Sequence, residues 1–528
     1  MGTVLERGGW NMELQRESVH MRRQRSRSSL QVTLEDDFNV PDTKPDVERI
    51  VTQNGRIEIL ESNLLNGKLL VKGMLHFTML YITHESKQYV HSIQGKIPFD
   101  EMVNMEEVKE QDEVKVVWNL EDITINLINS RKISVKSLVG LVCSAWEQFD
   151  EDLVVGAEAD TRQPCRYQEM EVTELKVAKK DLLRAKESFH LPTGKPNIDQ
   201  ILYYNLELQG REMRAQDGQI LLRGELVLFV LYSTQEEGKL ACYEGEQPFY
   251  STIPCEACKE SMLLQMEIEP ASTELQIKQD EDGEERLFDA ELVLNLDICI
   301  FEEKRMQYLQ DMYSLDRQLQ LEKRRVQYRQ LFLQNNSQKR INEQVVVEPP
   351  QNPVSQICHS HGTVQMDEIR WEKNQIHMDG SVEITILYLG EQEEWPLGEL
   401  RVSVPFSHDI EGVGEQQAKH ADLRPRLEQL SVTMLGKDTV EVKLLLAMDV
   451  LLFENREYDM INGVTEQELD KAVIENLPDL VGYCIQPGDN LWTLAKRFYT
   501  TEEAIMELNQ LTDPELVPGE KILLLLDV

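Results

Sequence analysis

The residues best suited to chemistry are two groups of thiols and imidazoles. Cys255-Glu-Ala-Cys258 forms one Cys-x-x-Cys pair, and Cys358-His359-Ser360-His361 adds further side chains of the kind that bind zinc. A structural zinc ion needs four ligands, which usually come as two such pairs. Because the second group lies far along the chain from the first, we predict no metal site.

No other pattern in the sequence indicates catalysis. The glycine-rich nucleotide loop G-x-x-x-x-G-K-[ST], the metalloprotease pattern H-E-x-x-H and the nucleophile pattern G-x-S-x-G do not occur. Acidic pairs such as Asp36-Asp37 and Glu393-Glu394 could imitate the carboxylates of a glycosidase. With 94 Asp and Glu residues such pairs arise by chance, and we interpret them as solvated surface. We predict a protein that is not an enzyme and needs no cofactor.

The composition narrows the class of partner and compartment. A net charge of −39 argues against nucleic acid and against an anionic membrane surface, since both attract basic faces. No apolar run approaches the roughly 18 residues that span a bilayer, and none precedes the arginines between Arg16 and Arg27 as in a secretory signal. Eight cysteines in 528 residues are sparse, which favours a reducing compartment. We expect a cytosolic protein of three or four domains without a transmembrane segment.

One pattern recurs three times along the chain. A short segment ending in Gly is followed by a Tyr and then by a Pro-Phe pair at similar spacing each time. The copies are Gly67–Gly73 with Tyr81 and Pro98-Phe99, Gly218–Gly224 with Tyr232 and Pro248-Phe249, and Asn374–Gly380 with Tyr388 and Pro405-Phe406. Lys44-Pro45 and Lys195-Pro196 precede the first two copies, whereas the third keeps only Pro353. The copies lie roughly 150 residues apart, which is a usual domain size.

The residues around these segments have the period of a β-strand. In the third copy, apolar residues from Ile376 to Tyr388 alternate with mostly polar ones, as expected for an antiparallel sheet with one wet face. A second alternating stretch closes each copy, at Ile133–Trp146, Phe288–Ile300 and Val440–Leu452. Each copy is therefore predicted to be a β-rich domain.

Two segments between the copies differ in character. Glu169–Lys186 and Glu302–Ile341 are rich in Lys, Arg, Gln and Leu at helical spacing, and the second reverses the overall acidity of the chain. We predict that both include helices. The second segment is interpreted either as a solvated helix that covers a sheet edge or as a docking patch for an acidic partner.

The C-terminal residues predict a small unit of the order βααβ. A short strand from Tyr483 runs into the turn Pro487-Gly488, and Asn490 or Asp489 can cap a helix with apolar positions at Leu491, Leu494, Ala495 and Phe498. Thr500 or Thr501 can cap a second helix, with Ala504, Ile505 and Leu508 facing inward. Asn509-Gln510-Leu511 ends this helix, and Pro518-Gly519 leads to a strand over Ile522–Leu526.

This unit closely resembles the LysM family, through Tyr483, Gly488, Asp489, Leu491, Leu494, Ala495, Asn509, Pro518 and Gly519. The resemblance implies a shallow groove that binds N-acetylglucosamine-containing glycans. Its walls would be Gly488, Asp489, Asn490 and Leu491 on one side and Leu511, Thr512 and Asp513 on the other. Trp492 has two interpretations, a partly buried helix residue or an exposed anchor for a protein partner.

Three β repeats followed by a LysM module resemble the DUF3794 (SPOCS) proteins of endospore-forming bacteria. The resemblance rests on Asp36-Asp37 to Ile50, on the Gly, Tyr and Pro-Phe repeats, and on the module. It implies a mother-cell protein at the forespore surface that joins the coat morphogenetic ATPase through its LysM module. The alternative function is that of a peptidoglycan-binding cell-wall protein. A cell-wall hydrolase lacks any recognisable catalytic domain here.

The fold class that we predict is mainly β with some α, with three antiparallel β-rich repeat domains plus a small C-terminal βααβ LysM domain. The predicted divisions are an N-terminal basic segment (1–30), repeat 1 (31–168), a helical connector (169–190), repeat 2 (191–301), a helical basic connector (302–343), repeat 3 (344–458), a linker (459–478) and the LysM domain (479–528).

Overall fold

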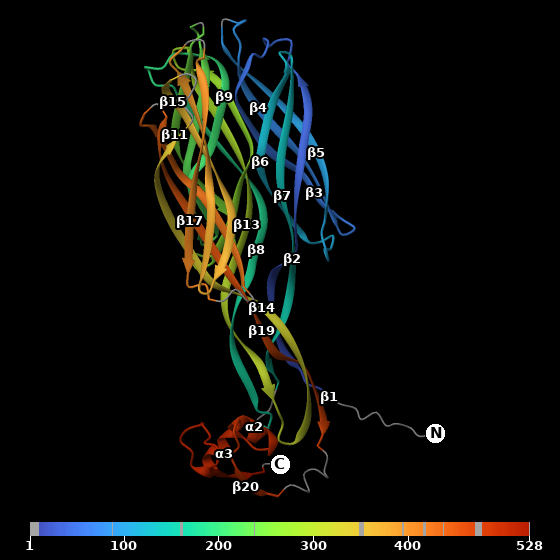
Figure 1. Cartoon of the computed structure of the whole chain (residues 1–528). Helices are drawn as coiled ribbons and strands as arrows, with labels where there is room; N and C mark the ends of the chain where they lie inside the picture. Colours follow the sequence, from blue (N-terminus) through green and yellow to red (C-terminus); the bar gives the residue numbers. More distant parts are fainter. Residues whose placement is uncertain are drawn as a thin grey trace, which may run out of the picture.

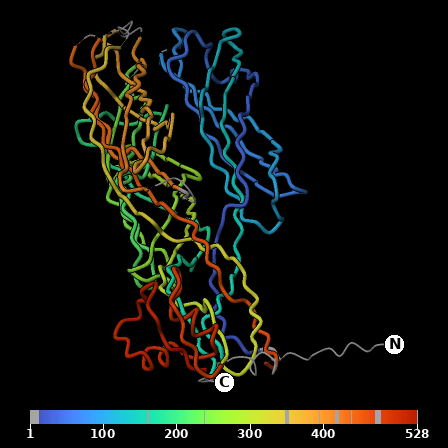
Figure 2. Tube along the Cα trace, turned by 60° about the horizontal axis from the view of Figure 1, so that its bottom comes forward, coloured from blue at the N-terminus to red at the C-terminus, as the bar shows by residue number. Residues whose placement is uncertain are grey.

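The computed structural model describes residues 10–86, 88–158, 162–236, 238–347, 353–392, 395–414, 419–436, 438–469 and 478–526. The molecule is elongated, with three β-rich repeats at one end and a stalk of paired strands below them (Figure 1). A small module with two helices lies at the foot of the stalk, and a view from another side shows the same order (Figure 2). Among the described residues, no helix is long and apolar enough to cross a membrane.

Each repeat consists of six strands in two three-stranded antiparallel sheets, one formed by its second to fourth strands and one by its first, sixth and fifth. Repeat 1 comprises β2 (Leu14–Asn39), β3 (Arg49–Leu65), β4 (Lys68–Ile82), β5 (Val90–Asn104), β6 (Glu113–Asn129) and β7 (Lys132–Ala157). Repeat 2 comprises β8 (Cys165–His190), β9 (Ile198–Gln216), β10 (Gln219–Thr234), β11 (Leu240–Pro254), β12 (Leu263–Gln279) and β13 (Glu285–Met312). Repeat 3 comprises β14 (Arg317–Val346), β15 (Val354–Glu372), β16 (Gln375–Gly390), β17 (Leu397–Glu411), β18 (Lys419–Met434) and β19 (Thr439–Glu468), and β1 (Trp10–Asn11) adds to β19.

The predicted strands are confirmed, but both predicted helical connectors are wrong. Residues 169–190 lie in β8 and residues 302–343 lie in β13 and β14, all of them strands. Lys, Arg, Gln and Leu favour helices only weakly, and pairing along the whole length of β13 and β19 overrides that preference. The first segment is thus part of the first strand of repeat 2, and the second holds the end of β13, a short turn and most of β14.

The predicted ends of the repeats change for the same reason. Most of the N-terminal basic segment forms β2, which pairs with β7. The predicted linker 459–478 begins inside β19, which continues to Glu468, and residues 470–477 of it lie outside the described residues. In each repeat, the first and last strands remain paired beyond the end of the fifth strand. In repeat 1, β6 pairs with β7 only as far as Trp146, whereas β2 pairs with β7 as far as Ala157. These two-stranded extensions form the stalk.

The conserved spacing of the Lys-Pro pair and the Tyr has a structural cause in the first two repeats. The buried hydroxyl of Tyr81 donates to the carbonyl oxygen of Pro45 at 3.0 Å, and Tyr232 donates to Pro196 at 3.1 Å. The central Gly has a cause as well, because Gly73 lies opposite Phe99 and a Cβ there would meet the Phe ring at 2.2 Å. The signature therefore fixes loops and ring packing, and it is not a site.

Each repeat has its own apolar core between its two sheets. Two further clusters join the repeats to one another. At the upper end, Leu80 of repeat 1, Leu231 of repeat 2 and Leu387 of repeat 3 share one buried cluster. In the stalk, another combines residues of all three repeats, including Met21 and Tyr328. The repeats are thus one packed body and not separate beads.

Candidate binding site in the C-terminal module

The C-terminal module has the predicted order of elements. It consists of β20 (Leu480–Cys484), α2 (Leu491–Arg497), α3 (Glu502–Asn509) and β21 (Lys521–Leu525), with β20 antiparallel to β21. Leu491, Leu494, Ala495 and Ile505 are buried as predicted. Leu508 is 38% exposed, so its predicted inward orientation is wrong, and Met506 packs against the core instead. The short α3 turns its third apolar position outward because only one of its faces meets α2 and β21.

The ends of both helices follow from local chemistry. The Asn490 side chain accepts a hydrogen bond from the Thr493 backbone at 2.9 Å, and the Thr493 hydroxyl completes a capping box. Thr501 caps α3 in the same way, accepting from the Ala504 backbone. Such caps satisfy amides that have no partner within the helix. The turn before α2 is possible because Gly488 adopts a φ of +94°.

The predicted groove walls lie on two neighbouring loops. The backbone of Ile485, in the first loop, donates to Glu520 and accepts from Gly519 in the second, both at 2.9 Å. The exposed wall residues are Gly488, Asn490, Thr512 and Asp513, and Leu511 is partly buried. The walls are therefore open to solvent and are not covered by the repeats.

Two wall residues serve the fold of the module. The Asp489 carboxylate accepts from the Tyr483 hydroxyl at 2.9 Å and from the Gln486 amide at 2.7 Å, which closes the loop before α2. Leu491 is 3% exposed and belongs to the core. These two side chains support the first wall, so polar contacts from it would come from the backbone and from the amide nitrogen of Asn490, whose side-chain oxygen already caps α2.

Trp492 faces the stalk and not the groove. Its indole N–H donates to Asp311 at 2.9 Å, and its ring meets Tyr313 edge-on at 5.0 Å between centroids. The side chain is only 6% exposed, so the buried interpretation of Trp492 is confirmed and an exposed anchor is wrong. The reason is that the same face of α2 also carries Lys496, whose ammonium group bonds to Asp311 at 2.7 Å.

The stalk residues in this contact were not predicted from the sequence. Tyr313 donates to the carbonyl oxygen of Thr500 at 2.8 Å, from the turn between β13 and β14. Burial alone would raise the pKa of Asp311, but hydrogen bonds from Lys496 and Trp492 outweigh it and hold that pKa below its ordinary value. Asp311 is therefore a charged acceptor at neutral pH, which fixes the module on the stalk.

The outer face of the module's sheet is apolar and open. Leu480, Leu525 and Leu523 are 52%, 48% and 43% exposed, and Leu480 lies directly opposite Leu525. The amide side chain of Asn509 exchanges two hydrogen bonds with the backbone of Leu523 and so occupies the free edge of β21. Exposed apolar clusters of this kind mark contact surfaces. The sequence predicted the strand, but alternation alone did not say that no described residue covers its outer face.

The other groups with chemical potential are spread through the repeats. Cys255 and Cys258 lie in the core of repeat 2, whereas Cys358 packs between repeats beside Cys242. Within the described chain, no group of three or more metal-binding side chains occurs. Asp36 and Asp37 are exposed, as predicted. Glu393 and Glu394 lie outside the described residues.

The three repeats and the C-terminal module each match a known protein family. A family model described as SipL, SPOCS domain matches residues 46–128, 197–278 and 353–435, which hold the four inner strands of each repeat. A model described as LysM domain matches residues 483–524. Searches of curated proteins and of solved structures gave no match. The chain is accordingly a SipL-like protein, with three SPOCS domains followed by a C-terminal LysM domain.

Proposed function

We propose that this sporulation-related protein is a non-enzymatic scaffold for the spore coat, which docks through its LysM domain to a coat morphogenetic ATPase. The place of docking would be the forespore surface, in the mother-cell cytoplasm. Its family supports a role in sporulation, and neither domain family is catalytic. The three packed repeats would act as a rigid support that holds the LysM domain at one end.

The exposed leucine face of the LysM domain is the observation that carries this proposal. Leu480, Leu523 and Leu525 form an open apolar face on a chain that otherwise carries a net charge of −39. Burying such a face on a partner is favourable by about 25 cal/mol per Å² of apolar surface. The α2 face is already occupied by the stalk, so a partner would meet the sheet face.

The runner-up function is binding of an N-acetylglucosamine-containing glycan, which LysM domains recognise. The exposed walls at Gly488, Asn490, Thr512 and Asp513 favour it, because the loops that would hold the sugar are free of the repeats. The two functions use different faces of one domain, and they can be separated by substitution.

The experiment is a pull-down from lysate of sporulating cells with the full chain as bait, followed by detection of the coat ATPase. Substituting both Leu523→Lys and Leu525→Lys should abolish capture, whereas Leu182→Lys, at an equally exposed leucine of β8, should leave it unchanged. Thr512→Trp, in the second groove wall, should leave ATPase capture intact. If the wild-type chain captures no ATPase but binds muropeptides, and Thr512→Trp removes that binding, the glycan function is correct instead.

A further inference from the structure

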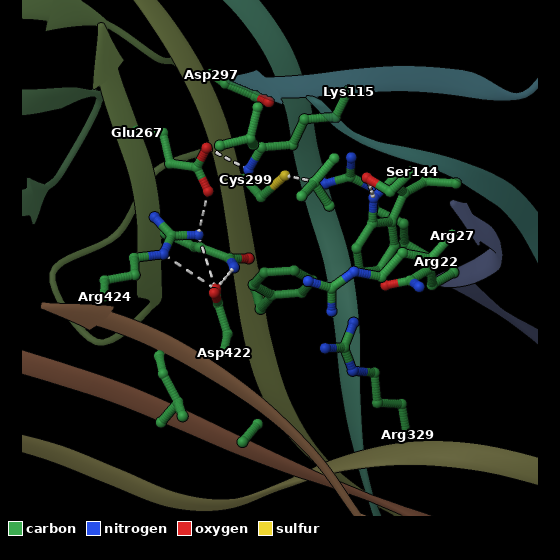
Figure 3. A pocket seen from close by; sticks show the side chains of 18 of the residues that line it. Arg22, Arg27, Lys115, Ser144, Glu267, Asp297, Cys299, Arg329, Asp422 and Arg424 are labelled. Carbon is green, nitrogen blue, oxygen red and sulfur yellow. Dashed lines mark hydrogen bonds and ion pairs between the residues drawn. The ribbon is translucent and has the colours of Figure 1, made fainter. Parts of the chain in front are cut away.

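A cavity of about 240 Å³, partly open to solvent, lies where strands of all three repeats face one another. Arg22 of β2 and Trp146 of β7 come from repeat 1, Cys299 of β13 from repeat 2, and Arg329 of β14 and Arg424 of β18 from repeat 3. Figure 3 shows Arg22, Arg27 and Arg329 on one side of the cavity, and Arg424 with Asp422 and Glu267 on the other. The volume is sufficient for a small molecule and not merely for one water.

Two arginines of the first side, Arg22 and Arg329, occupy equivalent positions in two repeats. One backbone bond recurs between the first and last strands of each repeat, from Val40 to Arg131, from Leu191 to Arg286 and from Val347 to Asp438. On the first strand of each repeat, one position lies the same number of residues before Val40, Leu191 and Val347. Its members are Arg22, Thr173 and Arg329.

An aromatic residue recurs beside this position on the last strand of each repeat, as Trp146, Phe301 and Phe453. The Arg22 guanidinium lies 4.7 Å from the centroid of Trp146, and that of Arg329 lies 3.7 Å from Phe453. Stacking on a ring holds a guanidinium in place without using its N–H donors. Both arginines are thus held in position with donors to spare.

The donors of these two arginines are incompletely used. Arg22 contacts Glu113 at 3.0 Å and the Cys299 sulfur at 2.6 Å, but its buried Nε has no partner. The Arg329 guanidinium makes no hydrogen bond or ion pair with any described residue. Burial lowers the pKa of Arg329 to about 10; the charge of Arg22 adds to this effect, and the charge of Asp422 opposes it. Arg329 therefore remains charged at neutral pH.

Cations engage two of the carboxylates across the cavity, Glu267 and Asp422, although the charge of Asp422 still acts on Arg329. Arg424 lies 2.6 Å from Glu267 and 2.7 Å from Asp422, and Lys115 also pairs with Glu267. Asp297 lies near Lys115, away from Arg329 (Figure 3). Arg22 thus has one anionic partner, Glu113, whereas the nearby Arg329 has none among the described residues, and a buried unpaired charge costs free energy until an anion joins it.

We propose that the arginine side of this cavity binds a small dianion, either inorganic phosphate or a short dicarboxylate, between Arg22 and Arg329. Guanidinium groups bind such oxyanions through paired, charge-assisted hydrogen bonds. Because Arg22 belongs to repeat 1 and Arg329 to repeat 3, the anion fastens the two repeats together. This inference is independent of the docking role of the LysM domain.

The test is the melting temperature of the full chain during separate titrations with sodium phosphate and sodium succinate, at ionic strength held constant with sodium chloride. We expect a saturable rise with phosphate, with succinate or with both, since a ligand of the native state stabilises it by mass action. A chain whose melting temperature responds to neither anion would overturn the proposal.

Arg329→Gln separates the anion site from a structural role. In chloride it should melt at or above the wild-type temperature, because it removes an uncompensated charge, and its affinity for the stabilising anion should fall by about tenfold or more. Arg325→Gln, an exposed neighbour on β14 that pairs with Asp459, should keep the wild-type response. Arg329→Lys keeps the charge but not the paired donors, so it should fold and bind more weakly. Wild-type affinity in both Arg329 variants would contradict the proposal.

Discussion

At the scale of single residues, the repeat signature is explained by polar side chains that close loops. Arg286 donates from Nη1 to the carbonyl oxygen of Lys195 at 3.0 Å and from Nη2 to that of Pro192 at 2.7 Å. Arg131 makes the same contacts in repeat 1, and Asp438 stands at this position in repeat 3. Repeat 3 therefore lacks both the arginine and the Lys-Pro pair that it would contact. The sequence showed the Lys-Pro pair, but its arginine partner is about 90 residues distant in the chain and carries no local signal.

Removing Arg286 should destabilise repeat 2. We expect Arg286→Met to lower the free energy of unfolding by about 2–4 kcal/mol, because it leaves several loop carbonyls without their charged donor. Urea unfolding followed by circular dichroism measures the effect. Arg184→Met, at an exposed arginine of β8, is the matched control and should change stability little. Equal stability of the two variants would refute the role of Arg286.

The ion pair between His361 and Glu207, 3.0 Å apart, should make stability depend on pH. Burial would lower the His361 pKa, but the hydrogen bond to Glu207 raises it above 6.5. Burial would raise the Glu207 pKa, but His361, Asn205 and Gln209 hold it below 4.5. The histidine contribution is full below pH 6.5 and is lost as pH rises through the raised pKa. The glutamate contribution is full above pH 4.5 and is lost as pH falls through the lowered pKa.

The wild-type advantage over His361→Gln should therefore be largest between about pH 4.5 and 6.5. Urea midpoints of both proteins at pH 5.5 and pH 8.5 measure it, with a larger difference expected at pH 5.5. A difference that grows toward pH 8.5 would mean that the pair is not charged in the folded state.

At the scale of elements, the sequence predicted the inner strands and the LysM order but failed at the first strand of each repeat. Inner strands such as β16 alternate between buried and partly buried residues over Ile376–Ile386, and alternation is a local signal. β14 instead carries Arg, Lys and Gln along both faces, because its lower half lies in a narrow stalk where only residues such as Tyr328 point inward. No local window contains that information, since each residue of β14 pairs with a residue of β19 that lies roughly 90 to 150 positions farther along the chain.

The contact between α2 and the stalk should hold the LysM domain in place. Trp492→Ala removes the bond to Asp311 and the ring contact with Tyr313, but it leaves the module core of Leu491, Leu494 and Ala495 intact. We expect the LysM domain to keep its fold and to unfold in a calorimetric transition of its own, at lower temperature. Arg497→Ala, at an exposed position of α2, should keep the wild-type profile. A wild-type profile for Trp492→Ala would show that the stalk contact does not hold the domain.

At the scale of the whole molecule, the repeats depend on one another through the stalk. Tyr328 is fully buried in a cluster that includes Met21 of repeat 1 and Met170 of repeat 2, and its hydroxyl has no hydrogen-bond partner within the described chain. The sequence predicted three separate domains because each repeat has a complete pattern of its own. The shared clusters depend on how the repeats pack, which one repeat's pattern does not encode.

Two substitutions at Tyr328 test this shared core. Tyr328→Ala should cost about 3–5 kcal/mol by leaving a cavity. Tyr328→Phe should be neutral or stabilising by about 1 kcal/mol, because it removes an unpaired buried hydroxyl. Urea unfolding of both variants measures the difference. A large loss for Tyr328→Phe would show that the hydroxyl has a partner in solution.

We propose that the LysM domain binds a protein through its leucine face while the stalk holds the domain in place. The most direct measurement is the dissociation constant of the purified coat ATPase for the immobilised full chain, by biolayer interferometry. We expect saturable binding that weakens at least about tenfold in the chain with both Leu523→Lys and Leu525→Lys. Leu182→Lys should leave the binding unchanged. Binding of equal strength to all three chains, or to none of them, would contradict the proposal.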